Sequence, residues 1–351
     1  MSLETVVCLV PLLLMLALLG IVYSSRSSPF TSLMTPSASN RSVPFAPPPL
    51  ANFYNDSYST YSCVRPNGSK FPHPGSAPKF MIIGSHKSGS TAMYSYLMLH
   101  GHVRPALCKE VKFFDHEQEF TKGRAYYLSN FPNLTSTPHV ITGDGSPTYI
   151  YHPLVPGRVR NMLGESQAKL RFLAGFRHPS LRFFSHWVGQ YFRRETNLTC
   201  RAYWDVSLSE LHKCLQLRNN TLAECEIELF EHNPVVRGMY ASQVERWLEV
   251  FPPHQFLLYS SEFLFANVEQ TMQHVAKFLG VRPYNAIELE SFHGAYLGTN
   301  HLGDTHTYPF ANECDSELKS RVDQFYQPHN ARLVQLLLQK FPHNSNLWLS
   351  W

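Results

Sequence analysis

A short loop near residue 87 holds the residue types that bind a phosphate or another tetrahedral anion. The segment Gly84–Thr91 reads GSHKSGST; it follows the apolar run 79–84 and precedes a stretch with helical spacing at 91–102. Backbone N–H groups at the start of a helix point outward, and the helix dipole favours an anion there. Glycines such as Gly89 let the backbone turn closely around oxygen atoms. The loop therefore predicts an anion site whose side-chain donors are Lys87, Ser88, Ser90 and Thr91.

This loop differs from the Walker A phosphate loop. In that motif, G-x-x-x-x-G-K-[ST], the lysine directly follows the second glycine, whereas Lys87 lies two residues before Gly89. A nucleotide-dependent kinase built on the same strand, loop and helix stays open as an alternative, but this chain lacks the Walker A lysine that such a kinase needs. A simple Gly/Ser turn with an exposed lysine is a second alternative, and the order of strand, loop and helix argues against it.

A second candidate anion site follows the apolar run 170–176. In the segment RHPSLRFFS, Arg177 comes directly after this run and Ser185 lies one to two helical turns further on. The guanidinium group offers a planar fork of N–H donors that matches phosphate, so Arg177 and Ser185 can hold one phosphate together. Arg182 is expected either to be structural or to face an acceptor. Packing or surface roles are expected for His178 and His186.

A carboxylate that can take up a proton lies in the segment KEVKFFD, residues 109–115. A hydroxyl group is a poor nucleophile, and a positioned general base such as Glu110 would help it to attack. The alternative is that Glu110 only forms ion pairs with its neighbours Lys109 and Lys112.

The elements that must position these residues alternate along the chain. Short apolar runs at 79–84, 170–176 and 255–259 predict buried strands. Helical spacing is found at 91–102, 179–194, 238–251, 268–279 and 317–341. Strands that alternate with helices form parallel sheets covered by helices. We therefore expect an α/β fold with a central parallel sheet flanked by helices.

The first part of the chain reads as a membrane anchor followed by a spacer. Residues 5–23 are apolar and close to the length that spans a bilayer, and a cleaved secretory signal is the alternative. Residues 24–76 are rich in Ser, Pro and Asn and show no helical or strand period, as in a solvated stem. The predicted organisation is a short cytoplasmic tail at 1–4, a signal-anchor at 5–23, a stem at 24–76 and one lumenal domain at 77–351.

Sequons and cysteines also favour an oxidising, lumenal compartment. Six N-x-S/T sequons occur, at Asn40, Asn55, Asn67, Asn133, Asn197 and Asn219. Six cysteines lie outside the apolar run, and an even number in a lumenal domain suggests disulfides with fifteen possible connectivities. The short spacing makes Cys214–Cys225 the first candidate pair. With 16% charged residues and a net charge of +4, the chain is too weakly basic to suggest nucleic acid as a partner.

Several of these motifs resemble one family. The loop 84–91 resembles the 5′-phosphosulfate loop of sulfotransferases that use PAPS (3′-phosphoadenosine 5′-phosphosulfate), and RHPSLRFFS resembles their 3′-phosphate motif R-x-P-x-x-R-x-x-S. The resemblance covers roughly 79–341 and is similar to the Golgi membrane-bound heparan sulfate 3-O- and N-sulfotransferases. Residues 238–265 also look like the GalNAc 4-sulfate 6-O-sulfotransferases. The family's E-x-H-F-F-D stretch implies Glu110 as the base, with Lys112 in place of its histidine and near the acceptor or the leaving group.

The resemblance has two departures. The heparan-type enzymes carry a lysine just before an S/T-P-x-Y segment, where this chain has Gly145. Residues 294–309 have neither the late cysteine pair nor the K-G-R of the 3-O-enzymes.

Taken together, the resemblance implies a type II Golgi membrane protein that moves a sulfuryl group from PAPS to a carbohydrate hydroxyl, without a metal. An inactive PAPS- or glycan-binding protein stays an alternative. The acceptor, the position sulfated and the oligomeric state stay open.

Overall fold

The computed structural model describes residues 75–217, 220–295 and 314–342. The predicted tail, the signal-anchor and almost all of the stem lie outside these ranges, as do residues 296–313. Within the described ranges, no helix combines the length and the apolar character needed to cross a bilayer.

Five strands form one parallel sheet. They are β1 (Phe80–Gly84), β2 (Val103–Arg104), β3 (Ile141–Asp144), β4 (Arg171–Phe176) and β5 (Phe256–Ser260). Their spatial order is β2-β3-β1-β4-β5, and each neighbouring pair is parallel. From β1 the chain goes to β2 at one edge of the sheet, comes back to place β3 between β2 and β1, and then places β4 on the other side of β1. At such a change of direction, the ligands of open α/β sheets bind beyond the carboxyl ends of the strands.

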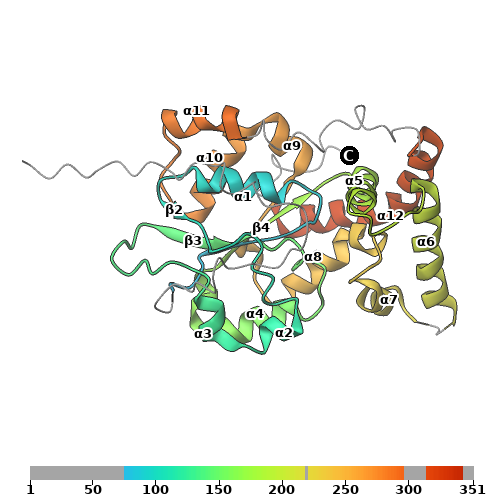
Figure 1. Ribbon diagram of the computed structural model, residues 1–351, viewed down its shortest axis with the longest axis horizontal. Helices are drawn as coiled ribbons and strands as arrows, with labels where there is room; N and C mark the ends of the chain where they lie inside the picture. The colour runs from blue at the N-terminus through green and yellow to red at the C-terminus, as the bar shows by residue number, and fades with distance from the viewer. Residues whose placement is uncertain (1–74, 218–219, 296–313, 343–351) are drawn as a thin grey trace, which may run out of the picture. The chain divides into compact units, whose positions relative to one another are not determined.

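Helices cover both faces of the sheet, and the strand residues alternate between two cores. On one face, Ile82 and Leu173 pack into a cluster with α1 (Ser90–Met98), α9 (Ser261–Ala266), α10 (Val268–Leu279) and α11 (Ala286–Ala295). These helices lie along the top of Figure 1. On the other face, Ile83 and Phe172 pack against α3 (Gly123–Leu128), α4 (Val155–Leu163) and α8 (Tyr240–Leu248). The short α2 (Glu117–Phe120) precedes α3. A sheet that is apolar on both faces explains why its strands read as unbroken apolar runs.

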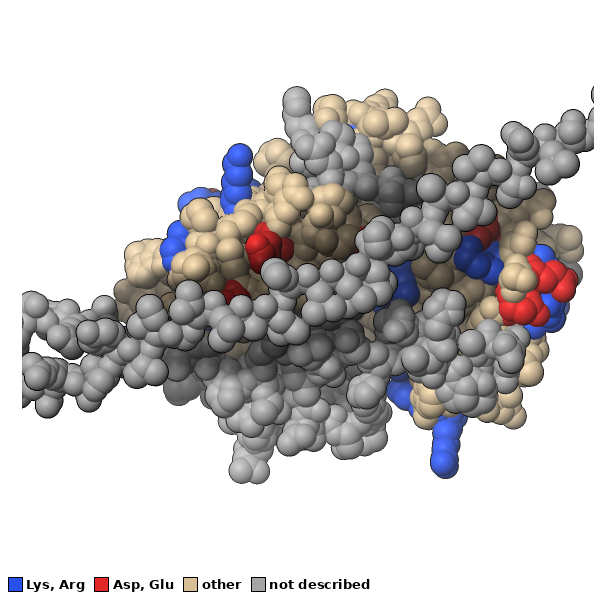
Figure 2. Space-filling view, turned by 90° about the horizontal axis from the view of Figure 1, so that it is seen from above, with Lys and Arg blue, Asp and Glu red and all other residues tan. Residues whose placement is uncertain are grey.

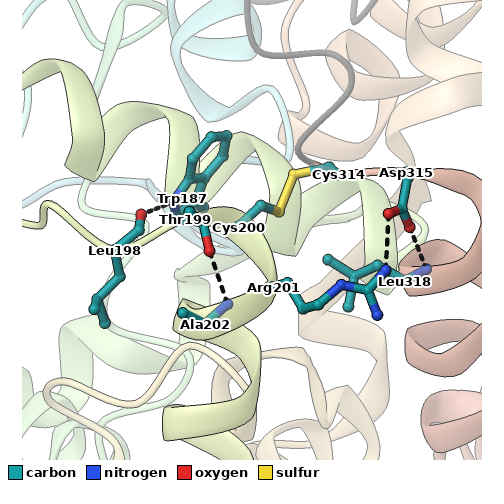
Figure 3. Close-up of a disulfide and its surroundings, with 9 residues drawn as sticks. All are labelled: Trp187, Leu198, Thr199, Cys200, Arg201, Ala202, Cys314, Asp315 and Leu318. Carbon is teal, nitrogen blue, oxygen red and sulfur yellow. Dashed lines mark hydrogen bonds and ion pairs between the residues drawn. A yellow bond between two sulfur atoms is a disulfide. The ribbon is translucent and has the colours of Figure 1, made fainter.

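A third cluster packs helices against one another beyond the edge of the sheet. It joins α5 (Pro179–Phe192), α6 (Cys200–Leu217), α7 (Leu222–Leu229) and α12 (Ser316–Lys340), with Trp187, Trp204 and Tyr326 fully buried. Two disulfides hold this cluster together. Cys214–Cys225 confirms the predicted pair. Cys200–Cys314 joins the first residue of α6 to the residue before Asp315, the N-cap of α12, and Arg201 pairs with Asp315 beside it (Figure 3). Arg201 also pairs with Glu317.

The predicted strands and helices are confirmed with small changes at their ends. The runs 79–84, 170–176 and 255–259 correspond to β1, β4 and β5. The helix predicted at 91–102 ends at Met98, and that predicted at 238–251 begins at Tyr240 and ends at Leu248. Helices α5, α10 and α12 match their predicted spans to within two residues. The central parallel sheet flanked by helices is confirmed.

Candidate active site

The residues singled out in the sequence gather at the carboxyl ends of the strands. Lys87 follows β1, Arg177 follows β4, and the segment 145–149 follows β3. The carboxyl ends of parallel strands meet at one edge of the sheet, so these groups share that edge.

The anion loop is built from internal hydrogen bonds and two left-handed residues. Lys87 has a φ of 70° and Gly89 a φ of 82°, and a non-glycine residue in this region is uncommon. The N–H of Ser88 donates to the carbonyl of Ser85 at 3.1 Å, and the hydroxyls of these two serines lie 2.8 Å apart. A Cβ on Gly89 would come within 2.9 Å of Cζ of Phe265, so both φ and space require glycine there.

Two of the predicted hydroxyl donors are turned inward. Ser88 is 1% exposed, its hydroxyl faces Ser85, and its carbonyl accepts a hydrogen bond from the Ser261 hydroxyl at 2.8 Å. Ser90 opens α1 and is also buried, whereas Thr91 is exposed. Ser88 thus stabilises the loop itself, and the groups directed outward are Lys87, the Thr91 side chain and the first-turn N–H groups of α1.

Lys87 lies among other cations. Burial, together with the charges of Arg193, Arg177 and Arg182, lowers the pKa of Lys87 to about 8, while the charge of Glu110 acts in the opposite direction. The loop, the residue after β4, the helix α5 and the predicted base are therefore within electrostatic reach of one another. The structure thus places the predicted residues Glu110 and Arg177 within electrostatic reach of Lys87, and their roles stay predictions.

The second predicted anion site spans the end of β4 and the next helix. The carbonyl of Arg177 accepts a hydrogen bond from the Tyr240 hydroxyl at 3.0 Å, and Ser185 lies in the second turn of α5. Arg182 is 1% exposed, and its Nη2 donates to the carbonyl of Pro234. Of the two roles predicted for Arg182, the structure supports the structural one. It does not place this side chain on an acceptor-facing surface.

Buried nitrogen atoms near the loop have no partner within the described residues. They are Nδ1 of His86, both ring nitrogens of His186, and Nε and Nη1 of Arg182. The rings of His86 and His186 meet edge to face with centroids 5.5 Å apart. Burial, together with Lys87, Arg237 and Arg182, lowers the pKa of both histidines well below the ordinary value, so both are neutral. A buried set of donors and cations such as this favours an anionic ligand.

The predicted base lies between two lysines. Oε1 of Glu110 is 3.3 Å from Nζ of Lys109, and Oε2 is 3.4 Å from Nζ of Lys112. The Glu110 side chain is 12% exposed. Both ion pairs considered in the sequence are present, and they hold the carboxylate at the edge of the sheet near Lys87.

Two residues that matter for this geometry were not predicted. The hydroxyl of Tyr240, the first residue of α8, interacts with Ser85 and Ser88 of the anion loop as well as with the carbonyl of Arg177. Asp144 ends β3 and is fully buried beneath the Glu110 segment. The sequence gives no local signal for Tyr240. The polar residues after an apolar strand could have indicated Asp144.

Surface features complete the inventory of predicted sites. Of the six sequons, Asn133 and Asn197 lie in the described ranges, and both side chains are exposed.

Within those ranges no three His, Cys, Asp or Glu side chains are grouped so that they could hold a metal ion. On the described part of the face shown in Figure 2, Lys and Arg side chains are scattered among uncharged residues and form no continuous basic patch.

Comparison with known proteins defines the class. The chain matches the sulfotransferase domain family over residues 77–293, and it belongs to that family. It is 27% identical over 277 residues to the bifunctional heparan sulfate N-deacetylase/N-sulfotransferase 3 of Homo sapiens, a match that covers 74% of this chain but only 30% of that protein. It is 28% identical over 276 residues to heparan sulfate glucosamine 3-O-sulfotransferase 5 of Mus musculus, covering 74% and 72% of the two chains.

A solved structure agrees with this assignment at the level of the fold. The crystal structure of a sulfotransferase from Alicyclobacillus acidocaldarius superposes with a TM-score of 0.50 at 21% identity, covering 75% of this chain and 96% of the other. The resemblance recognised in the sequence is confirmed.

Proposed function

We propose that the protein transfers the sulfuryl group of PAPS to a hydroxyl of a carbohydrate, a glycosaminoglycan or related polysaccharide, with Glu110 as general base. The observation that carries this proposal is that a carboxylate and an ammonium from different loops, Glu110 and Lys87, lie within electrostatic reach of each other at the open edge of the sheet. One can take a proton from an acceptor while the other faces the anion that leaves.

The described residues suit a donor with several anionic groups. Lys87 and the start of α1 follow β1, and Arg177 follows β4. Arg193, Arg177 and Arg182 all lower the pKa of Lys87, and Glu110 is the one carboxylate among the main influences on it, while Arg193 itself pairs with Glu195. The phosphosulfate of PAPS would lie against Lys87 and the α1 N-terminus, and its 3′-phosphate against Arg177 and Ser185. Each would supply the negative charge that this set of cations lacks.

The proposed chemistry is direct in-line transfer. Glu110 removes the proton of the acceptor hydroxyl as its oxygen forms a bond to sulfur. The bond between sulfur and the bridging phosphate oxygen breaks, and Lys87 stabilises the negative charge that develops on that oxygen. Lys109 and Lys112 hold the two oxygens of Glu110 in place. Of these two lysines, Lys112 is the candidate for contact with the acceptor.

A glycosaminoglycan acceptor is supported by the relatives, which are named as heparan sulfate enzymes. A Golgi location as a type II membrane protein is supported by the apolar run at 5–23 and by the exposed sequons Asn133 and Asn197. The departures at Gly145 and at 294–309 leave a galactosaminoglycan equally suitable as the acceptor. The second of these segments lies outside the described residues.

The test is transfer of labelled sulfate from PAPS to a panel of desulfated glycosaminoglycans by the full-length protein. Wild type is compared with Glu110→Gln and Lys87→Ala, and Glu117→Gln is the matched control because Glu117 is an exposed glutamate paired with Arg158. We expect transfer to one polysaccharide, a loss of roughly 100-fold or more in kcat for Glu110→Gln, and no change for Glu117→Gln. PAPS binding without transfer to any polysaccharide would support the inactive binding protein, and failure to bind PAPS would refute the proposal.

A further inference from the structure

The segment that carries Glu110 is held by side-chain hydroxyl groups from outside it. The N–H of Ala106 donates to the hydroxyl of Tyr94 at 3.1 Å. Further along the segment, the N–H of Lys112 donates to Oγ of Ser146 at 3.0 Å, and the N–H of Phe113 donates to the hydroxyl of Tyr149, also at 3.0 Å. Glu110 lies two residues before Lys112, so the direction of its carboxylate depends on these hydrogen bonds.

The carboxylate of Asp144 accepts hydrogen bonds from two of these hydroxyl groups. It is the last residue of β3 and is 0% exposed. The Ser146 hydroxyl donates to its Oδ1 at 2.6 Å, and the Tyr149 hydroxyl donates to its Oδ2 at 2.9 Å. Each hydroxyl thus gives its proton to Asp144 and keeps its lone pairs for a backbone N–H of the Glu110 segment.

We propose that Asp144 is a positioning residue for the Glu110 base, because its carboxylate orients the hydroxyls of Ser146 and Tyr149 that hold the backbone of Lys112 and Phe113. The inference rests on the proposed function only in taking Glu110 as the base. Asp144 itself is fully buried and acts through the two hydroxyls.

The same network makes the arrangement sensitive to pH. The Tyr127 hydroxyl of α3 also donates to Oδ2 of Asp144, at 3.1 Å. Burial raises the pKa of Asp144 to about 6, although hydrogen bonds from Ser146, Tyr149 and Tyr127 oppose the rise, and the charge of Asp115 adds to it. The charge of Asp144 also contributes to the raised pKa of the Tyr94 hydroxyl in α1.

Ionised Asp144 accepts all three hydroxyl protons. A protonated Asp144 must donate a proton of its own, so at least one hydroxyl has to turn away. We therefore expect kcat to fall as the pH drops through about 6. Stability changes in the opposite sense. A raised pKa means that the folded chain holds this proton more tightly than the unfolded chain, so the contribution of Asp144 to stability is lost as the pH rises from 3.8 towards about 6. A fall in activity on acidification is then not caused by unfolding through this group.

The first variant is Asp144→Asn, in which one carboxylate oxygen becomes an N–H₂ donor. We expect kcat to fall about 10- to 100-fold, with unchanged affinity for PAP and without the limb near pH 6 in the kcat profile. Hydrogen exchange, followed by mass spectrometry, should be faster in the peptide covering 106–115. Thr142→Val is the matched control because Thr142 lies two residues earlier on β3, is 1% exposed, and has an Oγ1 without a partner in the described part of the chain. It should leave kcat and the exchange unchanged.

The second variant is Tyr127→Phe, which separates positioning from folding. Its hydroxyl donates to Asp144, whereas the N–H groups of Lys112 and Phe113 are held by other hydroxyls. Because the Tyr127 hydrogen bond lowers the pKa of Asp144, its removal should move the acid limb to higher pH while the plateau of kcat is kept. This readout remains informative if Asp144→Asn does not fold.

The outcomes separate this inference from the proposed function. Wild-type kcat, pH profile and exchange in Asp144→Asn would overturn the inference, as would an unmoved acid limb in Tyr127→Phe. If Glu110→Gln keeps full activity while Asp144→Asn still speeds exchange in 106–115, the assignment of the base fails and the network stands.

Discussion

The ammonium group of Lys87 lies next to Gly189, a residue without a side chain in α5. A Cβ on Gly189 would be 3.4 Å from Nζ of Lys87 and 3.3 Å from Nη1 of Arg193. Gly189 is in the last turns of α5, where a glycine costs helix stability of roughly 0.5–1 kcal/mol relative to alanine. The proximity of Lys87 in the anion loop therefore explains a glycine at position 189, whereas helix formation does not.

Substitution Gly189→Leu should displace the Lys87 ammonium, because atoms beyond Cβ would enter the space it occupies. We expect kcat/KM for PAPS to fall about 10- to 100-fold without loss of the fold. The matched control is Gly157→Leu in α4, where a Cβ would have no neighbour within 4 Å. Steady-state kinetics of the two variants gives the test, and equal activity in both would show that Lys87 does not need this space.

The lowered pKa of Lys87 predicts an alkaline limb in donor use. Burial and three arginines lower its pKa to about 8, so the free enzyme loses this charge as the pH rises through that value. We expect kcat/KM for PAPS to decline above about pH 8, and the decline should be absent in Lys87→Arg, which stays charged. A pH profile identical in the two proteins would assign the limb to another group.

The same group makes a prediction about stability. When the pKa of a lysine is lower in the folded than in the unfolded state, its contribution to the free energy of unfolding is complete above the unfolded-state pKa. This contribution is lost as the pH falls through the folded-state pKa. Between 10.5 and about 8 the loss corresponds to about 3 kcal/mol. Lys87→Met should therefore be more stable than wild type at pH 7, with the difference vanishing near pH 10.5, as measured by urea denaturation. A less stable Lys87→Met at pH 7 would contradict this account.

The two described disulfides should contribute unequally to stability. Cys200–Cys314 closes a loop of sequence separation 114, and Cys214–Cys225 one of 11. In the chain-entropy description, the longer loop restricts the unfolded state more, by about 2 kcal/mol. The double variants Cys200→Ala/Cys314→Ala and Cys214→Ala/Cys225→Ala, compared by urea denaturation under oxidising conditions, provide the measurement. A larger loss in the second pair would mean that native packing, and not loop closure, dominates.

The sequence predicted the parts of the fold that local pattern determines. β1, β4 and β5 are unbroken apolar runs, and their burial on both faces follows from that pattern. The sequence ITGD of β3 shows no such run. It forms a strand because the ring of Phe80 packs over Gly143, where a Cβ would come within 2.3 Å of Cε2, and because three hydroxyls satisfy Asp144. The contacts from Phe80 and Tyr127 come from residues distant in the sequence, whereas Ser146 and Tyr149 follow Asp144 closely.

The site shows the same division. Lys87 and Arg177 were predicted because each lies in a motif that directly follows a strand, whereas Glu110 was predicted from the resemblance of its segment to the E-x-H-F-F-D stretch. The inward turn of Ser88 depends on the conformation of the loop and on Ser261, 173 residues away. The disulfide Cys200–Cys314 could not be chosen from fifteen connectivities, because its two ends meet only after α5, α6 and α12 have packed together.

The ring of Tyr94 takes the place that a side chain at position 145 would need, and Lys109 lies beside it. A Cβ on Gly145 would lie 2.7 Å from Cδ2 of Tyr94 and 3.4 Å from Cγ of Lys109. Tyr94 is 3% exposed, and its hydroxyl holds the N–H of Ala106 at the start of the Glu110 segment. A side chain at 145 would push against this ring and loosen the segment, whereas Lys109 already places its ammonium 3.3 Å from Glu110.

We therefore expect that Gly145→Lys will not add a useful cation. It should lower both stability and kcat, whereas Lys109→Met should lower kcat with little effect on stability, because Glu110 keeps its second ion pair with Lys112. Lys122→Met is the matched control, since Lys122, the residue just before α3, forms an exposed ion pair with Glu119. Thermal unfolding and steady-state kinetics of the three variants test the prediction. Higher kcat in Gly145→Lys would show that the site lacks a cation, and wild-type kcat in Lys109→Met would show that Lys109 does not supply one.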